Sequence, residues 1–240
     1  DADVISVHRA REGVGEEEAS AAAKEIIHQM RSLLGGPGPD PNLGLDMDLR
    51  LEKAGKRFQT YGRPLLVRET PLAPPPLIAR LAELGWTRFE TVKVMTTDLA
   101  RLELPDMLDH LPSHDVGRFV DASLAVAGED AALKPALAEI ISAIRPATGM
   151  FTIETADGRP ASVALCVQDN DLAGILSLTV DAGSRRRGMG TEILSSALRW
   201  ARISGARSAW LQVSDDNLPA LDLYRKFGFR EAYEYHYWRE

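Results

Sequence analysis

The stretch from Leu176 to Gly190, LSLTVDAGSRRRGMG, decides how the rest of this chain is interpreted. Its first residues belong to an apolar run, Ile175 to Val180, which predicts a buried strand. After a short turn, the basic sequence Arg185 to Gly190 leads into a run of helix formers that begins at Thr191. Backbone N–H groups and the dipole at a helix N-terminus favour an anion, glycines admit a ligand close to the backbone, and arginines add charge-assisted hydrogen bonds. The stretch therefore predicts a strand, a turn that binds a diphosphate, and a helix.

A second block follows this helix. The sequence SAWLQVS (208–214) predicts a strand, and NLPALDLYRKFGF (217–229) combines an asparagine, a short helix with a Leu-Tyr pair, and a Gly-Phe turn. Together with the R-x-x-G-x-G pattern at 185–190, this block resembles the two sequence signatures of the GNAT superfamily of N-acetyltransferases. The resemblance covers the chain from about Met150 to its last residue.

The resemblance implies an α/β fold of the α+β type: the GNAT fold, a mixed central sheet flanked by helices. Helices are expected at 115–126 and 130–144, and a hairpin at 149–154 and 162–168 around Asp157-Gly158. Residues 99–112 link this half to the preceding one and are expected to supply its first strand. Residues 105–240 are therefore predicted to form a GNAT acetyltransferase domain.

The first half has a related but incomplete pattern. Helices are expected at 16–34 and 46–61 around a Pro/Gly-rich loop at 35–42, a short strand at 4–7, and then a strand (64–69), a helix (74–84) and a strand (89–95). Aligning Gly85 with Gly228 overlays LIARLAELGWTRFETVKVM on ALDLYRKFGFREAYEYHYW, which indicates a degenerate internal duplication. The first copy lacks the glycine signature, and Leu81 takes the place of Tyr224. We therefore predict that residues 1–104 are a truncated, degenerate GNAT-like half; two unrelated α/β pieces are the alternative.

Composition narrows the choice of partners. The 240 residues carry a net charge of −7, which disfavours nucleic acid and suits a cationic amine. No apolar run approaches the roughly 20 residues of a membrane span, and the first residues lack a signal-peptide pattern, so a cytoplasmic location is expected. The single cysteine, Cys166, lies in an apolar run and is expected to be a core residue. No metal site is predicted.

The resemblance assigns roles to individual residues. Backbone groups of Leu178, Thr179 and Val180 are expected to pair with the pantetheine arm of acetyl-CoA, and the Val180 N–H to point at the thioester oxygen. Tyr224 is the expected general acid for the CoA thiolate, and Asn217 binds the CoA arm, caps its helix, or does both. The other expected cofactor-binding positions are Arg185, Arg186, Arg187, Gly188, Met189, Gly190, Thr191 and Ala220.

The general base is less well defined. Some relatives that acetylate protein N-termini carry a glutamate in the strand before the asparagine motif, but this chain has Gln212, and an amide accepts no proton there. Glu154 on the neighbouring hairpin is the candidate base, with a water that carries the proton out as the alternative. Tyr235 and His236 either line the acceptor cleft or are structural.

The sequence thus favours an N-acetyltransferase that moves an acetyl group from acetyl-CoA to a primary amine by direct attack in a ternary complex. The acceptor is a small molecule, an amino acid or a peptide N-terminus. A non-catalytic acyl-CoA-binding or regulatory module is the alternative, and a dinucleotide-binding domain is disfavoured because the glycines do not follow G-x-G-x-x-G. Pairing of the last strands in a homodimer is left open.

Overall fold

A computed structural model describes residues 65–73, 75–105 and 109–240. The elements predicted before residue 64 lie outside these residues. The described strands are β1 (Val67–Glu69), β2 (Thr87–Asp98), β3 (Ala147–Glu154), β4 (Pro160–Asp169), β5 (Leu172–Val180), β6 (Ser208–Ser214) and β7 (Arg230–Arg239). The described helices are α3 (Pro75–Glu83), α4 (Val116–Ala127), α5 (Lys134–Ser142), α6 (Met189–Ile203) and α7 (Leu218–Lys226), with short 3-10 turns at Ala131–Leu133 and Ala182–Ser184.

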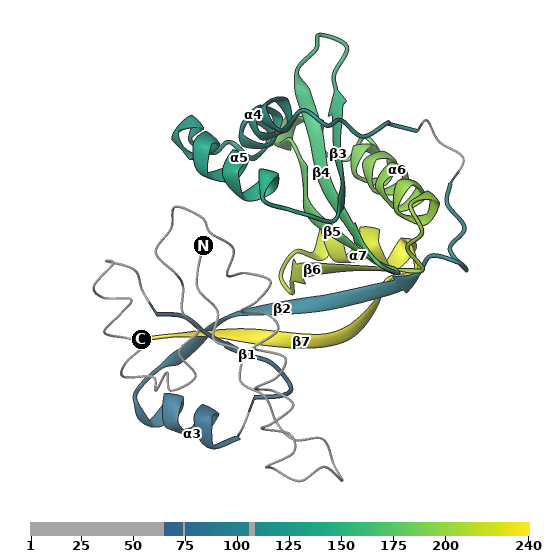
Figure 1. The fold of residues 1–240 in the computed structure, drawn as a ribbon. Coiled ribbons are helices and arrows are strands. Elements are labelled where there is room, and N and C mark those ends of the chain that lie inside the picture. The colour runs from purple at the N-terminus through teal and green to yellow at the C-terminus, as the bar shows by residue number, and fades with distance from the viewer. Residues whose placement is uncertain (1–64, 74, 106–108) are drawn as a thin grey trace. The chain divides into compact units, whose positions relative to one another are not determined.

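These strands form one mixed sheet in the order β1-β7-β2-β6-β5-β4-β3 (Figure 1). β5 and β6 run parallel, and β3, β4 and β5 pair antiparallel in succession. The sheet and its flanking helices confirm the predicted fold class. From residue 65 onward the other predicted strands and helices are also confirmed, each within a few residues of its expected bounds, with the exception of the strand expected within residues 99–112.

The chain divides into two compact units, whose described parts lie within residues 65–91 with 234–240 and within residues 92–233. In the first unit, β1 pairs antiparallel with β7, and Leu81 of α3 packs with Val67, Trp86 and Trp238 in a small core. The second unit includes residues 92–98 of β2, on the N-terminal side of the predicted boundary at 104. The assignment of residues 1–104 to a degenerate GNAT-like half stays a prediction.

In the second unit the sheet is covered on both faces. The buried side of α6, including Ile193, Leu194 and Leu198, belongs to one core cluster with Ala173 and Ile175 of β5. On the opposite face, α4 contributes residues such as Phe119 to a second cluster. Burial on both faces explains why β4 is almost continuously apolar, and it places Cys166 in the core as predicted.

The segment 99–112 differs from its prediction. Among its described residues no strand forms, and directly after it an isolated bridge joins Ser113 to Met150 of β3. The segment instead follows α6, where Arg202 donates to the Leu102 carbonyl (3.2 Å), Arg199 donates to the Pro105 carbonyl (3.1 Å), and the His110 N–H donates to Ser196 Oγ (3.0 Å). Prolines at 105 and 112 provide no N–H for a strand ladder, and polar side chains of α6 take up the backbone groups instead.

Candidate active site

The signature strand β5 separates from its neighbour β6 partway along its length. Parallel pairing joins Leu172–Ile175 to Ser208–Leu211, and among the described residue pairs it ends there. Both strands nevertheless continue, β5 to Val180 and β6 to Ser214. The two strands therefore form a fork that opens toward their C-terminal ends.

A β-bulge shapes the β5 side of this fork. Val163 faces Thr179 but Leu165 faces Leu176, so two residues of β5, Ser177 and Leu178, lie opposite the single residue Ala164 of β4. Ser177 has a left-handed φ of 51°. Beyond the bulge, the Asp181 N–H donates to the Ala161 carbonyl (2.8 Å). Since backbone direction alternates along a strand, the backbone groups of Leu178 and Val180 face away from β4 and toward the fork.

The third predicted backbone position, Thr179, has the opposite orientation. It pairs with Val163, and its carbonyl accepts a hydrogen bond from Ser162 Oγ (3.1 Å). Thr179 therefore anchors β5 to β4, while Leu178 and Val180 present backbone groups to the fork. The bulge was missed at the sequence level, because a serine at positive φ leaves no compositional signal.

The basic turn after β5 has a strained, well-defined backbone. Arg186 has φ 63° and Gly188 has φ 84°, and Gly188 is the N-cap of the fifteen-residue helix α6. A non-glycine residue in this region costs on the order of 1–3 kcal/mol, and such strain is concentrated at functional sites. Arg185 turns back so that its Nε donates to the Val180 carbonyl (3.2 Å), which ties the turn to the end of β5.

The two glycines of the turn meet different requirements. A Cβ added at Gly188 would contact no atom within 4 Å, so the space over the helix start is open. A Cβ at Gly190 would lie 3.3 Å from Leu223 Cδ2 and 3.6 Å from Val180 Cγ2, so Gly190 lets α6 approach α7 and β5 closely. The exposed N-terminus of α6 can hold an anion through its backbone N–H groups, with Arg186 and Arg187 beside it.

Helix α7 carries the two side chains predicted to act on the cofactor. Asn217 is its N-cap and accepts a hydrogen bond from the Ala220 N–H (3.3 Å), so the capping role is confirmed. Tyr224 is buried with the core cluster that contains Leu211 and Val213 of β6, and its ring packs against Phe229. Burial raises the pKa of Tyr224, which keeps the phenol protonated at neutral pH and able to donate its proton.

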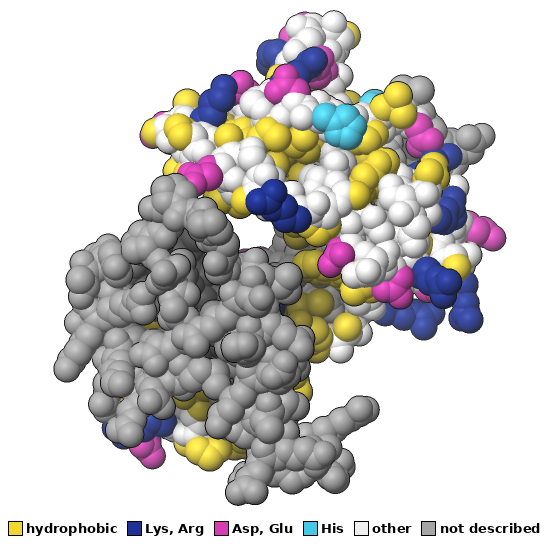
Figure 2. Space-filling model, viewed as in Figure 1, with side chains coloured by type: hydrophobic (Ala, Val, Ile, Leu, Met, Phe, Trp, Pro, Cys, Tyr) yellow, Lys and Arg dark blue, Asp and Glu magenta, His cyan; other side chains and the backbone are white. Residues whose placement is uncertain are grey.

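Glu154 lies at a different place from the fork. It ends β3, on the far side of β4 from β5, and its carboxylate accepts a hydrogen bond from Arg118 of α4 (2.7 Å). This ion pair raises the pKa of Arg118. Together they line an open pocket of about 320 Å³ at the outer edge of β3. Figure 2 shows cationic and anionic side chains close together over the hairpin formed by β3 and β4.

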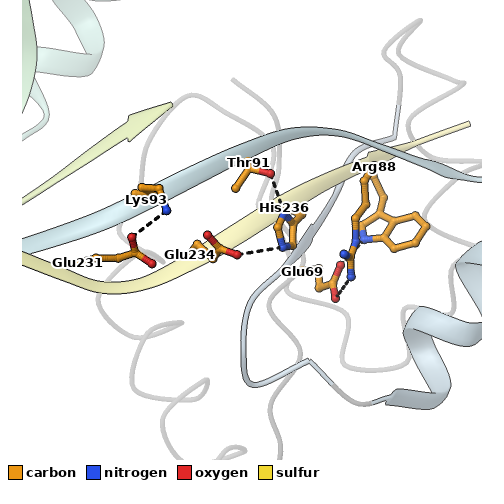
Figure 3. A network of polar contacts seen from close by, with 8 residues as sticks. Glu69, Arg88, Thr91, Lys93, Glu231, Glu234 and His236 are labelled. Atoms are coloured by element: carbon orange, nitrogen blue, oxygen red, sulfur yellow. Dashed lines mark hydrogen bonds and ion pairs between the residues drawn. The ribbon is translucent and has the colours of Figure 1, made fainter. Parts of the chain in front are cut away.

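The remaining candidate residues are at two further places. Gln212 is exposed on β6, one residue past the last pair with β5, and so stands at the mouth of the fork. Tyr235 and His236 belong to the other unit, where Arg68 lies 3.6 Å over the Tyr235 ring and His236 Nδ1 is 2.9 Å from Thr91 Oγ1 (Figure 3). These contacts within the unit favour structural roles for both.

Comparisons with known proteins support the fold and the family of this part of the chain. Residues 119–229 match the model of the acetyltransferase (GNAT) family. The ribosomal protein bS18-alanine N-acetyltransferase of Salmonella typhimurium is 35% identical over 78 residues, 32% of this chain and 53% of that protein. A solved GCN5-related N-acetyltransferase from Kribbella flavida superposes with a TM-score of 0.59 at 21% identity, covering 79% of this chain and 73% of that one. Residues 119–229 therefore form an acetyltransferase domain of the GNAT family.

A third similarity concerns a much larger protein. A bifunctional glutamine synthetase adenylyltransferase/adenylyl-removing enzyme of Streptomyces avermitilis is 51% identical over 61 residues, which are 25% of this chain but 6% of that protein. The chain thus matches between 6% and 53% of the length of these two curated relatives.

Within the described residues, none of the helices combines the length and the apolar character that crossing a membrane requires.

Proposed function

We propose that this chain is an N-acetyltransferase that moves the acetyl group of acetyl-CoA to a primary amine by direct attack in a ternary complex. One observation carries the proposal: the β5–β6 fork leads directly into the exposed, glycine-capped N-terminus of a long helix. An extended arm fits an open strand edge, and a diphosphate fits a helix N-terminus. The described residues therefore fit the two chemically distinct parts of CoA in the right order along the chain.

Binding rests on the backbone. Leu178 and Val180 present N–H and carbonyl groups that can pair with the amides of a pantetheine arm as a further strand would. The Val180 carbonyl also holds Arg185, so Val180 offers chiefly its N–H to the ligand, toward the thioester oxygen. The N–H groups from Arg186 to Thr191 hold the diphosphate, and Asn217 and Ala220 border the arm from the start of α7.

Catalysis by this domain is mainly positioning and proton transfer. Acetyl-CoA supplies an activated acetyl group as a thioester. A fixed N–H donor at the carbonyl oxygen stabilises the charge that develops as the amine attacks, and Tyr224 holds the proton that the leaving thiolate needs. Glu154 remains the carboxylate candidate for the base, although it lies on the far side of β4 from the fork and would have to release Arg118 to accept a proton. A water that carries the proton out of the fork is the alternative.

The test has two stages. Calorimetric titration with acetyl-CoA is expected to show binding by the wild type and none by Gly188→Trp, whose side chain would fill the open space over the helix start. A panel of amines, including peptides that begin with alanine, amino acids and small amines, is then assayed by detection of free thiol. Binding without turnover on any amine, with Tyr224→Phe indistinguishable from wild type, would instead indicate a non-catalytic acyl-CoA-binding module.

A further inference from the structure

The side chain of a tryptophan lies against a glycine of the neighbouring strand, beside the fork. Trp210 of β6 pairs with Gly174 of β5, and a Cβ added at Gly174 would lie 2.8 Å from Trp210 Cζ2 and 3.0 Å from its Cε2. The indole therefore covers the glycine, and it does so one residue before the last β5–β6 pair, Ile175 with Leu211. Its position is next to the point where the two strands separate.

Alternation along the strands identifies the face on which this indole lies. Ala209, Leu211 and Val213 point into the core cluster that contains the buried side of α6 and α7. Trp210 therefore points to the opposite face, as does Leu176, which packs with the α4 cluster. Helices α6 and α7 pack on the other face, whereas on the face of Trp210 helix α4 packs over β3, β4 and β5. We therefore expect an acceptor to approach the fork from the side of Trp210.

The neighbours of Trp210 leave its ring partly uncovered. On β2 its register partner is Thr96, which is short and exposed, and on β5 its partner is a glycine. The indole itself is partly exposed. The indole is therefore a partly exposed aromatic group between two small residues beside the fork.

A second tryptophan provides a contrast within the same chain. Trp200 of α6 lies near Gly149, where an added Cβ would be 3.2 Å from Trp200 Cδ2, but its ring packs edge-on against Phe151 (ring centroids 6.2 Å apart). For Trp210 no ring contact is found among the described residues. Trp200 thus has an aromatic partner in the core, whereas the partly exposed indole of Trp210 has none among the described residues.

We propose that Trp210 is the acceptor platform, and that the acceptors of this enzyme are primary amines that carry a flat aromatic group close to the amine. The proposal rests on the proposed function, since it places the reacting acetyl group in the adjacent fork. Stacking on the indole holds the aromatic group while the amine points to the fork. Gly174 is the positioning residue, because any side chain at this position would lift the indole from the sheet.

The experiment compares 2-phenylethylamine with n-butylamine and 1,4-diaminobutane as acceptors. In the wild type, kcat/KM for phenylethylamine is expected to exceed that for butylamine by about three- to tenfold, the size of one aromatic stacking contact. Trp210→Leu and Gly174→Ala are each expected to bring this ratio close to one, and Trp210→Phe to keep part of it. Trp200→Phe is the matched control, because the Trp200 ring packs against Phe151 in the core. This variant is expected to keep the full ratio.

A readout that does not need turnover separates this proposal from the proposed function. In nuclear magnetic resonance spectra, the indole N–H resonance of Trp210 is identified by its loss in Trp210→Leu. This resonance is expected to shift when phenylethylamine is added to protein saturated with CoA. If amines are acetylated but neither the signal nor the ratio responds, Trp210 is no acceptor platform while the acetyltransferase assignment stands. A preference for 1,4-diaminobutane that Trp210→Leu leaves intact would also overturn the platform. If acetyl-CoA fails to bind, both proposals fall.

Discussion

Replacing Gly188 by alanine tests the diphosphate site with an internal control. Gly188 caps α6 at φ 84°, and Gly128 caps α4 at φ 71°; an added Cβ meets no atom within 4 Å at either position. An alanine in this left-handed region costs roughly 1–2 kcal/mol, so both variants are expected to lose similar stability. That loss corresponds to a fall in Tm of about 2–4 °C per kcal/mol for a chain of this size.

The two variants are expected to differ in ligand binding. At Gly188 the new methyl group occupies the space over the helix start, where the diphosphate would approach the N–H groups of α6. Weakening one or two charge-assisted hydrogen bonds there costs roughly 1.5–3 kcal/mol, a loss of affinity for acetyl-CoA of about 10- to 100-fold. Gly128→Ala is expected to bind like the wild type, as measured by calorimetry below both melting temperatures. Equal affinities in the two variants would refute the placement of the diphosphate over Gly188.

Three further predictions concern single side chains. Tyr224→Phe is expected to lower kcat by about 100-fold or more, the contribution of a general acid, with the affinity for acetyl-CoA unchanged. Asn217→Ala is expected to cost about 1 kcal/mol of stability through the lost helix cap, whereas Asn217→Ser keeps the cap and reveals any contact of the amide with the ligand as weaker binding. Burial raises the pKa of Cys166 from its ordinary 9.0 to about 12, so on raising the pH the unfolded chain loses this proton before the folded chain does. The free energy of unfolding is therefore expected to fall between about pH 9 and 12, by up to about 1.4 kcal/mol per pH unit. This fall is measured relative to Cys166→Ala.

Each of these has an outcome that contradicts it. A Tyr224→Phe enzyme with wild-type kcat would move the general acid elsewhere. Asn217→Ser with unchanged affinity would reduce Asn217 to its cap. The Cys166 prediction is tested by denaturant titrations at pH 8 and pH 10 in the presence of reductant. If the free energy of unfolding falls equally in the wild type and in Cys166→Ala, the thiol does not contribute to the pH dependence.

Local patterns predicted much of this fold. The glycine turn and the helix formers after it predicted the start of α6, and Asn217 predicted the cap of α7, because these features depend on a few adjacent residues. The prediction of a strand within 99–112 was wrong for its described residues, since its outcome depended on distant polar side chains of α6 that take up its carbonyls.

Features that depend on register could not be predicted. β2 lies beside β6 because Val92–Asp98 pairs with Ser208–Ser214, more than a hundred residues later, and no local signal sets that pairing. The same holds for Trp210 over Gly174 and for the bulge at Ser177, each of which requires knowing which residues face one another. The backbone geometry of the site could therefore be expected only because the chain resembles the GNAT family.

The most direct test of the central claim is a crystal structure of the protein with acetyl-CoA. We predict the pantetheine arm in the fork, paired with the backbone of Leu178 and Val180, and the diphosphate on the N–H groups between Arg186 and Thr191. Cofactor bound elsewhere, such as in the pocket beside Glu154, or a diphosphate away from the start of α6, would contradict this account.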